Sequence, residues 1–195
     1  DVLGYKNYFA QGGDWGSYIA AWLAFDNPKN CKGIHINMMG FRHVNGTQNE
    51  EEKKWENDFE LNVIGAVRAI KKYLNLLKKS GSASILLFST VATKLGMPYH
   101  ASVSVAKSGI DGLVKTLGSE LAPKVRINAI APTITNTELA SKILRNDKVI
   151  ENMVERHPLK KILSSNEVAK MASFLISEDA SSISGQIFNM DAGIV

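Results

Sequence analysis

Residues 84–130 read SILLFSTVATKLGMPYHASVSVAKSGIDGLVKTLGSELAPKVRINAI, and this stretch decides the fold. It begins and ends with short apolar runs, Ser84 to Phe88 and Val125 to Ile130, which are typical of buried strands. The segment from about Ala101 to Leu121 has apolar residues at helical spacing, which predicts a core face made of Val105, Ile110, Leu113, Val114 and Leu117. Strands joined through a helix pair in parallel, so the stretch predicts an α/β fold with an open parallel sheet.

The same alternation of strands and helices extends along the rest of the chain. About five strands are expected in all, and the other three lie at Tyr8 to Gln11, Gly33 to Met38 and Gln186 to Met190. Further helices are expected at Ser17 to Phe25, from a Thr47–Glu50 capping box to about Lys79, at about Glu138 to Glu155, and at Asn166 to Ile176. The long helix would bury Phe59, Val63, Val67, Ile70, Leu74 and Leu77.

Composition is that of an ordinary globular protein. The chain has 195 residues, of which 45% are hydrophobic and 22% charged, and we expect a single α/β domain over 1–195. Its net charge of +4 comes from lysines mixed with acids, so we expect no nucleic-acid partner. The single cysteine, Cys31, excludes an internal disulfide and a cysteine metal cluster, and we expect no metal site. Because no apolar run is long enough for a membrane span and no signal peptide is visible, we expect a cytoplasmic protein without a membrane partner.

Ligands of open α/β sheets bind at the carboxyl ends of the strands. The segments that follow the predicted strands are therefore the candidates for a site, and they are Gly12 to Ser17, Met39-Gly40, Ser89-Thr90 and Ala131 to Thr137.

Several of these segments carry motifs of the short-chain dehydrogenase/reductase family, in that family's order. The motifs are Asn37–Gly40 (NMMG, for N-N-A-G), Asn62 in LNVIG, Ser89-Thr90 in FSTVA, Lys107 at the lysine of Y-x-x-x-K, Asn128–Thr137 (NAIAPTITNT, for N-x-x-x-P-G-x-x-x-T) and Gly185–Gly193 (GQIFNMDAG). The chain from about Asn37 to Val195 thus resembles the C-terminal half of this family, which implies a Rossmann-like parallel sheet in three layers.

The resemblance also implies an oxidoreductase that uses NAD or NADP on a small-molecule substrate. In the family's mechanism a tyrosine exchanges the substrate proton and a lysine, here Lys107, lowers the pKa of that tyrosine and grips the nicotinamide ribose. Asn62 would hold a water, and Thr90 or Ser89 would orient the carbonyl. The cofactor would contact Asn37, Gly40, Lys107, Pro132, Thr133, Thr135 and Thr137. We also expect a homo-oligomer, formed through the helices at about 50–79 and 101–121, which resemble the family's interface helices.

The predicted active site is incomplete, because Val103 stands where the family has its tyrosine. Valine cannot exchange a proton. Tyr99 or His100 could supply one from the preceding loop; alternatively, Tyr99 packs at the mouth of a cleft and His100 caps or flanks the helix. Thr133 replaces the glycine of the family's Pro-Gly turn, and its branched side chain is expected to restrict that turn and crowd the cofactor.

The first 38 residues follow a different pattern. Gly12 and Gly16 have the spacing of the family's first two phosphate-loop glycines, but Tyr18 takes the third position, and Asp14 would repel a pyrophosphate at the helix N-terminus. The family's second and third strands, which build the adenosine pocket, have no counterpart in the sequence.

The segment YFAQGGDWGSYIAAWLAFDNP instead resembles the nucleophile elbow of α/β-hydrolases of the epoxide hydrolase type, with Asp14 as the nucleophile. None of the histidines lies in the context of the late histidine that such an enzyme needs; alternatively, Asp14 caps the helix at Trp15 to Phe25. The sequence therefore reads as a truncated or recombined sheet, hydrolase-like over 1–38 and dehydrogenase-like over 39–195. Three functions remain open: a dehydrogenase-like oxidoreductase with an incomplete site, an epoxide-hydrolase-like enzyme, or a catalytically inactive chimera that serves as a scaffold.

Overall fold

The computed structural model describes residues 8–12, 29, 31–36 and 49–195. The chain divides into two compact units, 1–47 and 48–195, and each is described by itself. The expected helix at Ser17 to Phe25 and the Thr47 cap lie outside the described residues. The single domain over 1–195 stays a prediction.

The first unit contains a pair of parallel strands, β1 (Tyr8–Gly12) and β2 (Cys31–Ile36). Phe9 lies opposite Gly33 and Gly12 opposite Ile36, with an irregularity in register between Tyr8 and Phe9. Both predicted strands exist and their parallel pairing is confirmed, but β2 begins at Cys31, two residues before the predicted Gly33, and residues 37 and 38 of the predicted strand lie outside the described residues.

The second unit is built on a three-stranded parallel sheet in the order β3 (Ala83–Phe88), β4 (Val125–Pro132), β7 (Ile187–Met190). Ala83 lies opposite Val125, and Ala129 opposite Ile187. β4 is the central strand, and its residues from Ile127 to Ala131 are completely buried. A strand covered on both faces is mostly apolar, and β4 is apolar except at Arg126 and at the buried Asn128, whose Nδ2 donates to the Ile183 carbonyl at 2.9 Å.

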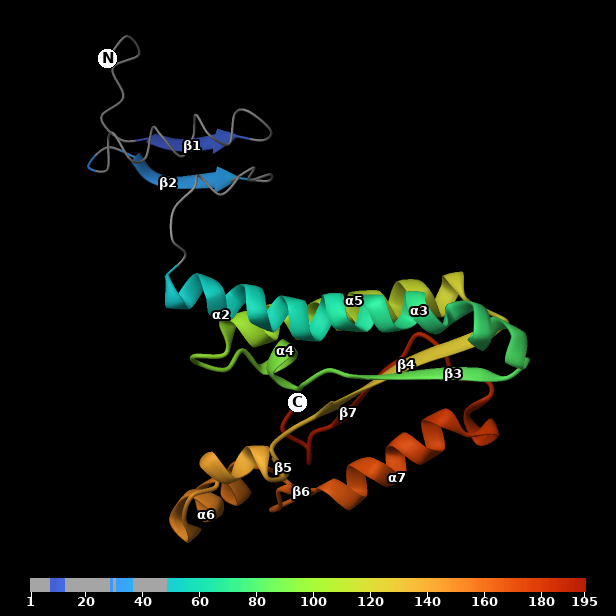
Figure 1. Cartoon of the computed structure of the whole chain (residues 1–195). Coiled ribbons are helices and arrows are strands. Elements are labelled where there is room, and N and C mark those ends of the chain that lie inside the picture. The colour runs from blue at the N-terminus through green and yellow to red at the C-terminus, as the bar shows by residue number, and fades with distance from the viewer. Residues whose placement is uncertain (1–7, 13–28, 30, 37–48) are drawn as a thin grey trace. The chain divides into compact units, whose positions relative to one another are not determined.

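Helices cover both faces of this sheet, which gives three layers (Figure 1). One face carries α2 (Glu50–Phe59), the π-helical turn η1 (Glu60–Ile64), α3 (Gly65–Ser80) and α5 (Ala101–Glu120), and the other carries α7 (Ser165–Ile176). The core between α3, α5 and the sheet centres on Ile70, Ile110, Val114, Ile127 and Ala129. The α/β fold with a Rossmann-like parallel sheet is thereby confirmed, and so is the existence of all five predicted strands.

Some predicted helix boundaries are wrong. The expected helix at about 138–155 is a 3₁₀ turn, η2 (Leu139–Lys142), followed by α6 (Asp147–Arg156). The break has a local cause, because the side chain of Asn146 accepts a hydrogen bond from the Val149 amide at 3.0 Å and starts a new helix. A short parallel pair, β5 (Thr135–Asn136) with β6 (Leu163–Ser164), was not predicted. The remaining short elements are α4 (Ala92–Leu95) and η3 (Glu178–Ala180).

Two helices begin with capping boxes. Asn49 and Glu52 close the start of α2, two positions after the residues that the sequence pattern suggested. Ser164 and Glu167 close the start of α7 in the same way. The pKa of Glu167 is lowered to about 2, first because Lys161 donates a hydrogen bond to its carboxylate and then because Ser164 does. Both caps satisfy amide groups that the first helical turn leaves unpaired.

The predicted core faces of two helices also need correction. Val105 is 49% exposed, and Phe59 and Val67 are exposed on the α2–α3 segment. On α5 the predicted Ile110 and Val114 are buried, and Leu113 and Leu117 pack against the same core, so only Val105 is wrong. Ala106 and Gly118 complete the buried face. Small residues at both ends of this face allow α5 to lie close to the chain beneath it.

The closest such approach is between Gly118 on α5 and Gly185 before β7. A Cβ added at Gly118 would meet the Gly185 Cα at 2.5 Å and the Gly185 nitrogen at 2.7 Å, which no real structure tolerates. The Gly185 amide at this point donates to the Ile127 carbonyl of β4 at 2.7 Å. The glycine pair therefore sets the height of α5 above the sheet, and with it the position of every side chain on that helix.

We predict that Gly118→Ala destabilises the protein by about 1–3 kcal/mol, because backbone must move to accept the methyl group. Gly112→Ala on the same helix is the matched control: its Cβ would meet nothing within 4 Å. It should stabilise by about 0.5–1 kcal/mol through helix propensity. Urea denaturation of both variants measures the difference, and equal effects at the two positions would contradict the close-packing argument.

Candidate active site

The candidate site lies at the carboxyl ends of β3 and β4. The Ser89 amide donates to the Ile130 carbonyl at 2.8 Å, and the Val91 amide donates to the Pro132 carbonyl at 3.2 Å. These bonds continue the β3–β4 ladder past the end of β3, as far as the last residue of β4. They bring the Ser89-Thr90 segment beside the segment 132–137, as the position of both segments in the sequence predicted (Figure 1).

The two candidate hydroxyl residues lie in different environments. Ser89 is only 4% exposed, and its Oγ is a buried atom without a hydrogen-bond partner among the described residues. Thr90 is half-buried, and its Oγ1 accepts a hydrogen bond from the Ala92 amide at 3.3 Å. The Thr90 hydroxyl proton remains available for a further bond. Of the two residues, Thr90 is therefore the better placed to hold a substrate carbonyl.

Lys107 reaches the same edge of the sheet from α5. Its Nζ donates a hydrogen bond to the Phe88 carbonyl, the last of β3, at 2.8 Å. Burial lowers the pKa of Lys107, and the Asp111 carboxylate one turn further along α5 acts in the opposite direction. Lys107 thus places a half-buried cation next to Ser89-Thr90.

No proton donor occupies the position that the family motif gives to its tyrosine. Val103 lies on α5 one turn before Lys107 and is half-buried. Tyr99 is 98% exposed, with a left-handed backbone φ of 62°, so the expectation that it packs at the mouth of a cleft is wrong. His100 flanks the start of α5 without a side-chain cap bond, and its Nδ1 lies 2.7 Å from the Pro98 carbonyl.

Asn62 lies in the π-helical turn η1 between α2 and α3. Its Nδ2 donates to the Asp58 carbonyl at 2.8 Å. The Asp58 carboxylate accepts a hydrogen bond of 2.6 Å from Ser102 Oγ, near the start of α5. A single π turn inside a helix is frequent at functional sites because it redirects one side chain. Asp58 and Ser102 are contacts that the sequence did not reveal, since 44 residues separate them.

Thr133 does not strain the turn that follows β4, and its predicted crowding of a cofactor stays a prediction. Its backbone needs no left-handed conformation, and its Oγ1 lies 2.8 Å from Nε2 of the buried His157. The Thr135 hydroxyl donates to the Thr133 carbonyl at 2.9 Å. The hydroxyl of Thr137 accepts from the Ala140 amide at 3.3 Å. Thr133 is thus accommodated by a partner on a different element.

The other predicted site residues belong to the first unit, 1–47. Asp14, Gly16, Asn37 and Gly40 lie outside the described residues. Gly12 ends β1 in the first unit. Within the described ranges, no group of three or more histidine, cysteine, aspartate or glutamate side chains could hold a metal ion. Over the same ranges no helix combines the length and apolar character that crossing a membrane requires.

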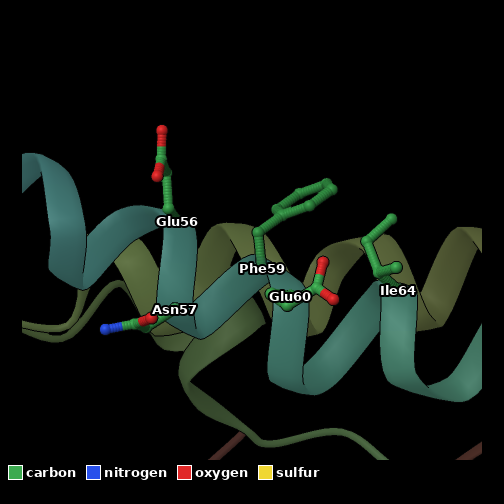
Figure 2. A pocket seen from close by; sticks show the side chains of 5 residues that line it. All are labelled: Glu56, Asn57, Phe59, Glu60 and Ile64. Atoms are coloured by element: carbon green, nitrogen blue, oxygen red, sulfur yellow. The ribbon is translucent and has the colours of Figure 1, made fainter.

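A cavity of about 370 Å³ lies elsewhere, along the α2–η1 segment. Figure 2 shows Glu56, Phe59 and Ile64 standing on the same side of this helix. Asn57 and Glu60 complete the lining. None of the predicted catalytic or cofactor-binding residues belongs to it, so the cavity is a feature of the helix surface and not of the candidate site.

Comparison with known proteins identifies the family. The sequence profile described as Enoyl-(Acyl carrier protein) reductase matches residues 30–195. The 3-oxoacyl-[acyl-carrier-protein] reductase of Thermotoga maritima is 30% identical over 146 residues, 74% of this chain and 58% of that protein. The chain belongs to the short-chain dehydrogenase/reductase family.

Two further proteins support this assignment. The 3-oxoacyl-[acyl-carrier-protein] reductase of Staphylococcus epidermidis is 26% identical over 162 residues, which cover 83% of this chain and 66% of that protein. A short-chain type dehydrogenase/reductase from Mycobacterium ulcerans has a similar structure, with a TM-score of 0.70 and 25% identity over 91% of this chain and 64% of its own. The chain thus spans between about half and two thirds of the length of the curated relatives it matches.

These comparisons give no support to a hydrolase-like segment over 1–38 or to a chimera. The family profile begins at residue 30 and includes β2, which the sequence pattern had assigned to the hydrolase-like part. A role of Asp14 as a nucleophile stays a prediction, because Asp14 lies outside the described residues.

Proposed function

We propose that this short-chain dehydrogenase/reductase relative binds the nicotinamide end of NAD or NADP but lacks the usual proton donor of an oxidoreductase. The observation that carries the proposal is the contrast on α5. Lys107 is anchored to the Phe88 carbonyl beside Thr90, whereas Val103 lies one turn earlier, where a proton donor would stand.

The residues present fit a nicotinamide ribose. Lys107 offers an ammonium group at the end of β3, and the Thr90 hydroxyl belongs to the segment that follows the same strand. The buried Ser89 Oγ is a polar atom for which the described residues supply no partner. A bound dinucleotide supplies or accepts the hydride. In this proposal Lys107 binds the ribose, Thr90 orients a substrate carbonyl, and Asn62 holds a water.

Cofactor binding is tested with Lys107→Met and with Lys115→Met, an exposed lysine on the same helix. We expect NADH or NADPH at 100 times its dissociation constant to stabilise the wild-type protein by about 2.7 kcal/mol in thermal melts. Lys107→Met should weaken binding at least about tenfold, as expected for the loss of a charged hydrogen bond, and Lys115→Met should not change it. A wild-type protein that none of NAD, NADH, NADP and NADPH stabilises would leave the inactive scaffold as the better description.

The missing proton donor predicts that Val103→Tyr raises reductase activity with a small carbonyl substrate. A positioned general acid contributes about 10²- to 10⁴-fold, so a gain of roughly a hundredfold in kcat/KM is expected. Val103→Phe supplies the same ring without the hydroxyl and should give no gain. Activity in the wild-type protein equal to that of Val103→Tyr would show that another group already supplies the proton.

We also propose that the protein is a homo-oligomer. Large apolar side chains are exposed along α2 to α3 and on α5; they are Trp55, Phe59, Leu61, Val67, Tyr73, Leu76 and Val105. Apolar side chains gathered in this way mark surfaces of association. Analytical ultracentrifugation should give the mass of a dimer or a larger oligomer. The double variant Tyr73→Glu with Leu76→Glu should shift the measured mass toward that of the monomer. A monomeric wild-type protein at micromolar concentration would refute oligomer formation.

A further inference from the structure

Three segments meet beside the carboxyl end of β4. The Thr133 amide donates to the Met190 carbonyl at the end of β7, at 2.8 Å. The Leu159 amide, two residues past His157, donates to the Ala192 carbonyl at 3.0 Å. The segment that follows α6 is therefore tied to the end of β7 next to the segment 132–137.

His157 occupies the centre of this junction. It is the first residue after α6 and is only 3% exposed. Its Nδ1 lies 2.6 Å from the Met153 carbonyl in the last turn of α6, and its Nε2 lies 2.8 Å from Thr133 Oγ1. Both ring nitrogens therefore have partners inside the protein, and the ring joins α6 to the strand end.

The partners define the direction of these hydrogen bonds. A backbone carbonyl only accepts, so His157 Nδ1 carries the proton that it donates to Met153. In the neutral ring Nε2 then has a free lone pair and accepts the Thr133 hydroxyl proton. For a neutral ring, these partners select the tautomer with the proton on Nδ1.

This contact orients the residue that replaces the glycine of the Pro-Gly turn. The Thr133 side chain is directed at His157, while its carbonyl accepts from the Thr135 hydroxyl. The next carbonyl, of Ile134, accepts from the Leu163 amide at 3.1 Å. A glycine at position 133 would have no side chain with which to reach His157.

We propose that His157 is a positioning residue that acts through Thr133 to fix the segment 132–137 in the conformation that meets the nicotinamide end of a dinucleotide. The cofactor part of this inference rests on the proposed function. The positioning part rests on the hydrogen bonds alone, so the two can be tested separately.

Four variants separate the contribution of the hydrogen bond from that of packing. Thr133→Val keeps the shape and removes the hydroxyl, and Thr133→Ser keeps the hydroxyl as a rescue. His157→Asn keeps a hydrogen-bond donor near the Met153 carbonyl and removes the Nε2 atom that accepts from the Thr133 hydroxyl. The double variant Thr133→Val with His157→Asn tests whether the two residues act as one unit.

The first readout is amide hydrogen exchange without cofactor. In Thr133→Val and in His157→Asn, the backbone amides of residues 133 and 163 should exchange about fivefold faster or more. This is the effect expected from the loss of one buried hydrogen bond. Thr133→Ser should match the wild type, and the double variant should be no faster than the faster single variant. The Gly185 amide, bonded to Ile127 in the core, serves as the internal control and should not change.

The second readout is the ¹⁵N spectrum of the His157 ring, which distinguishes the two neutral tautomers. The expected pattern has a protonated Nδ1 and an unprotonated Nε2. The opposite tautomer would contradict the bond to Met153 and overturn the arrangement on which the proposal depends.

The third readout is the dissociation constant for NADH, measured by fluorescence titration. Thr133→Val and His157→Asn should each weaken NADH binding about fivefold or more, while Thr133→Ser binds as the wild type does. If exchange changes as expected but the wild type binds no dinucleotide, the proposed function and the cofactor part of this inference fail, and the positioning part stands. Unchanged exchange in both Thr133→Val and His157→Asn overturns the role of His157, whatever NADH does.

Discussion

The pairing of β4 with a strand on each side is the constraint on which the rest of the second unit depends. β4 is buried from Ile127 to Ala131, so its amides and carbonyls cannot reach water and need partners within the protein. β3 and β7 supply these partners in parallel register. The ladder continues past the strand ends to the Ser89 and Thr133 amides. The residues that follow all three strands are therefore brought to one edge of the sheet.

The helix that carries Lys107 is placed by the same sheet. The close contact between Gly118 and Gly185 sets its height, and the bond from Lys107 to the Phe88 carbonyl fixes its charged group at the strand end. This geometry does not depend on the residue at position 103, because Val103 belongs to neither contact. The contacts that position Lys107 can thus be present although the side chain that would exchange the proton is absent.

The segment after β4 shows how a departure from a family motif can be accommodated. Thr133 replaces a glycine, yet its side chain is directed at the buried ring of His157, the first residue after α6. The contact joins residues 24 positions apart and leaves both nitrogens of His157 with partners. A replacement that the motif alone marks as damaging is therefore part of a buried hydrogen-bond network, and such networks tend to rigidify their surroundings.

The sequence by itself determined the five strands, the extent of α5 and the place of Lys107, because apolar runs and helical spacing are local properties of the chain. Only the tertiary structure decided that Val105 faces outward, that Tyr99 is almost fully exposed, and that Thr133 meets His157. It also decided between the two hydroxyl residues, burying Ser89 and leaving Thr90 accessible. The physical reason is the same in each case. Burial and hydrogen-bond partners are set by chain segments distant in sequence, and no local pattern carries that information.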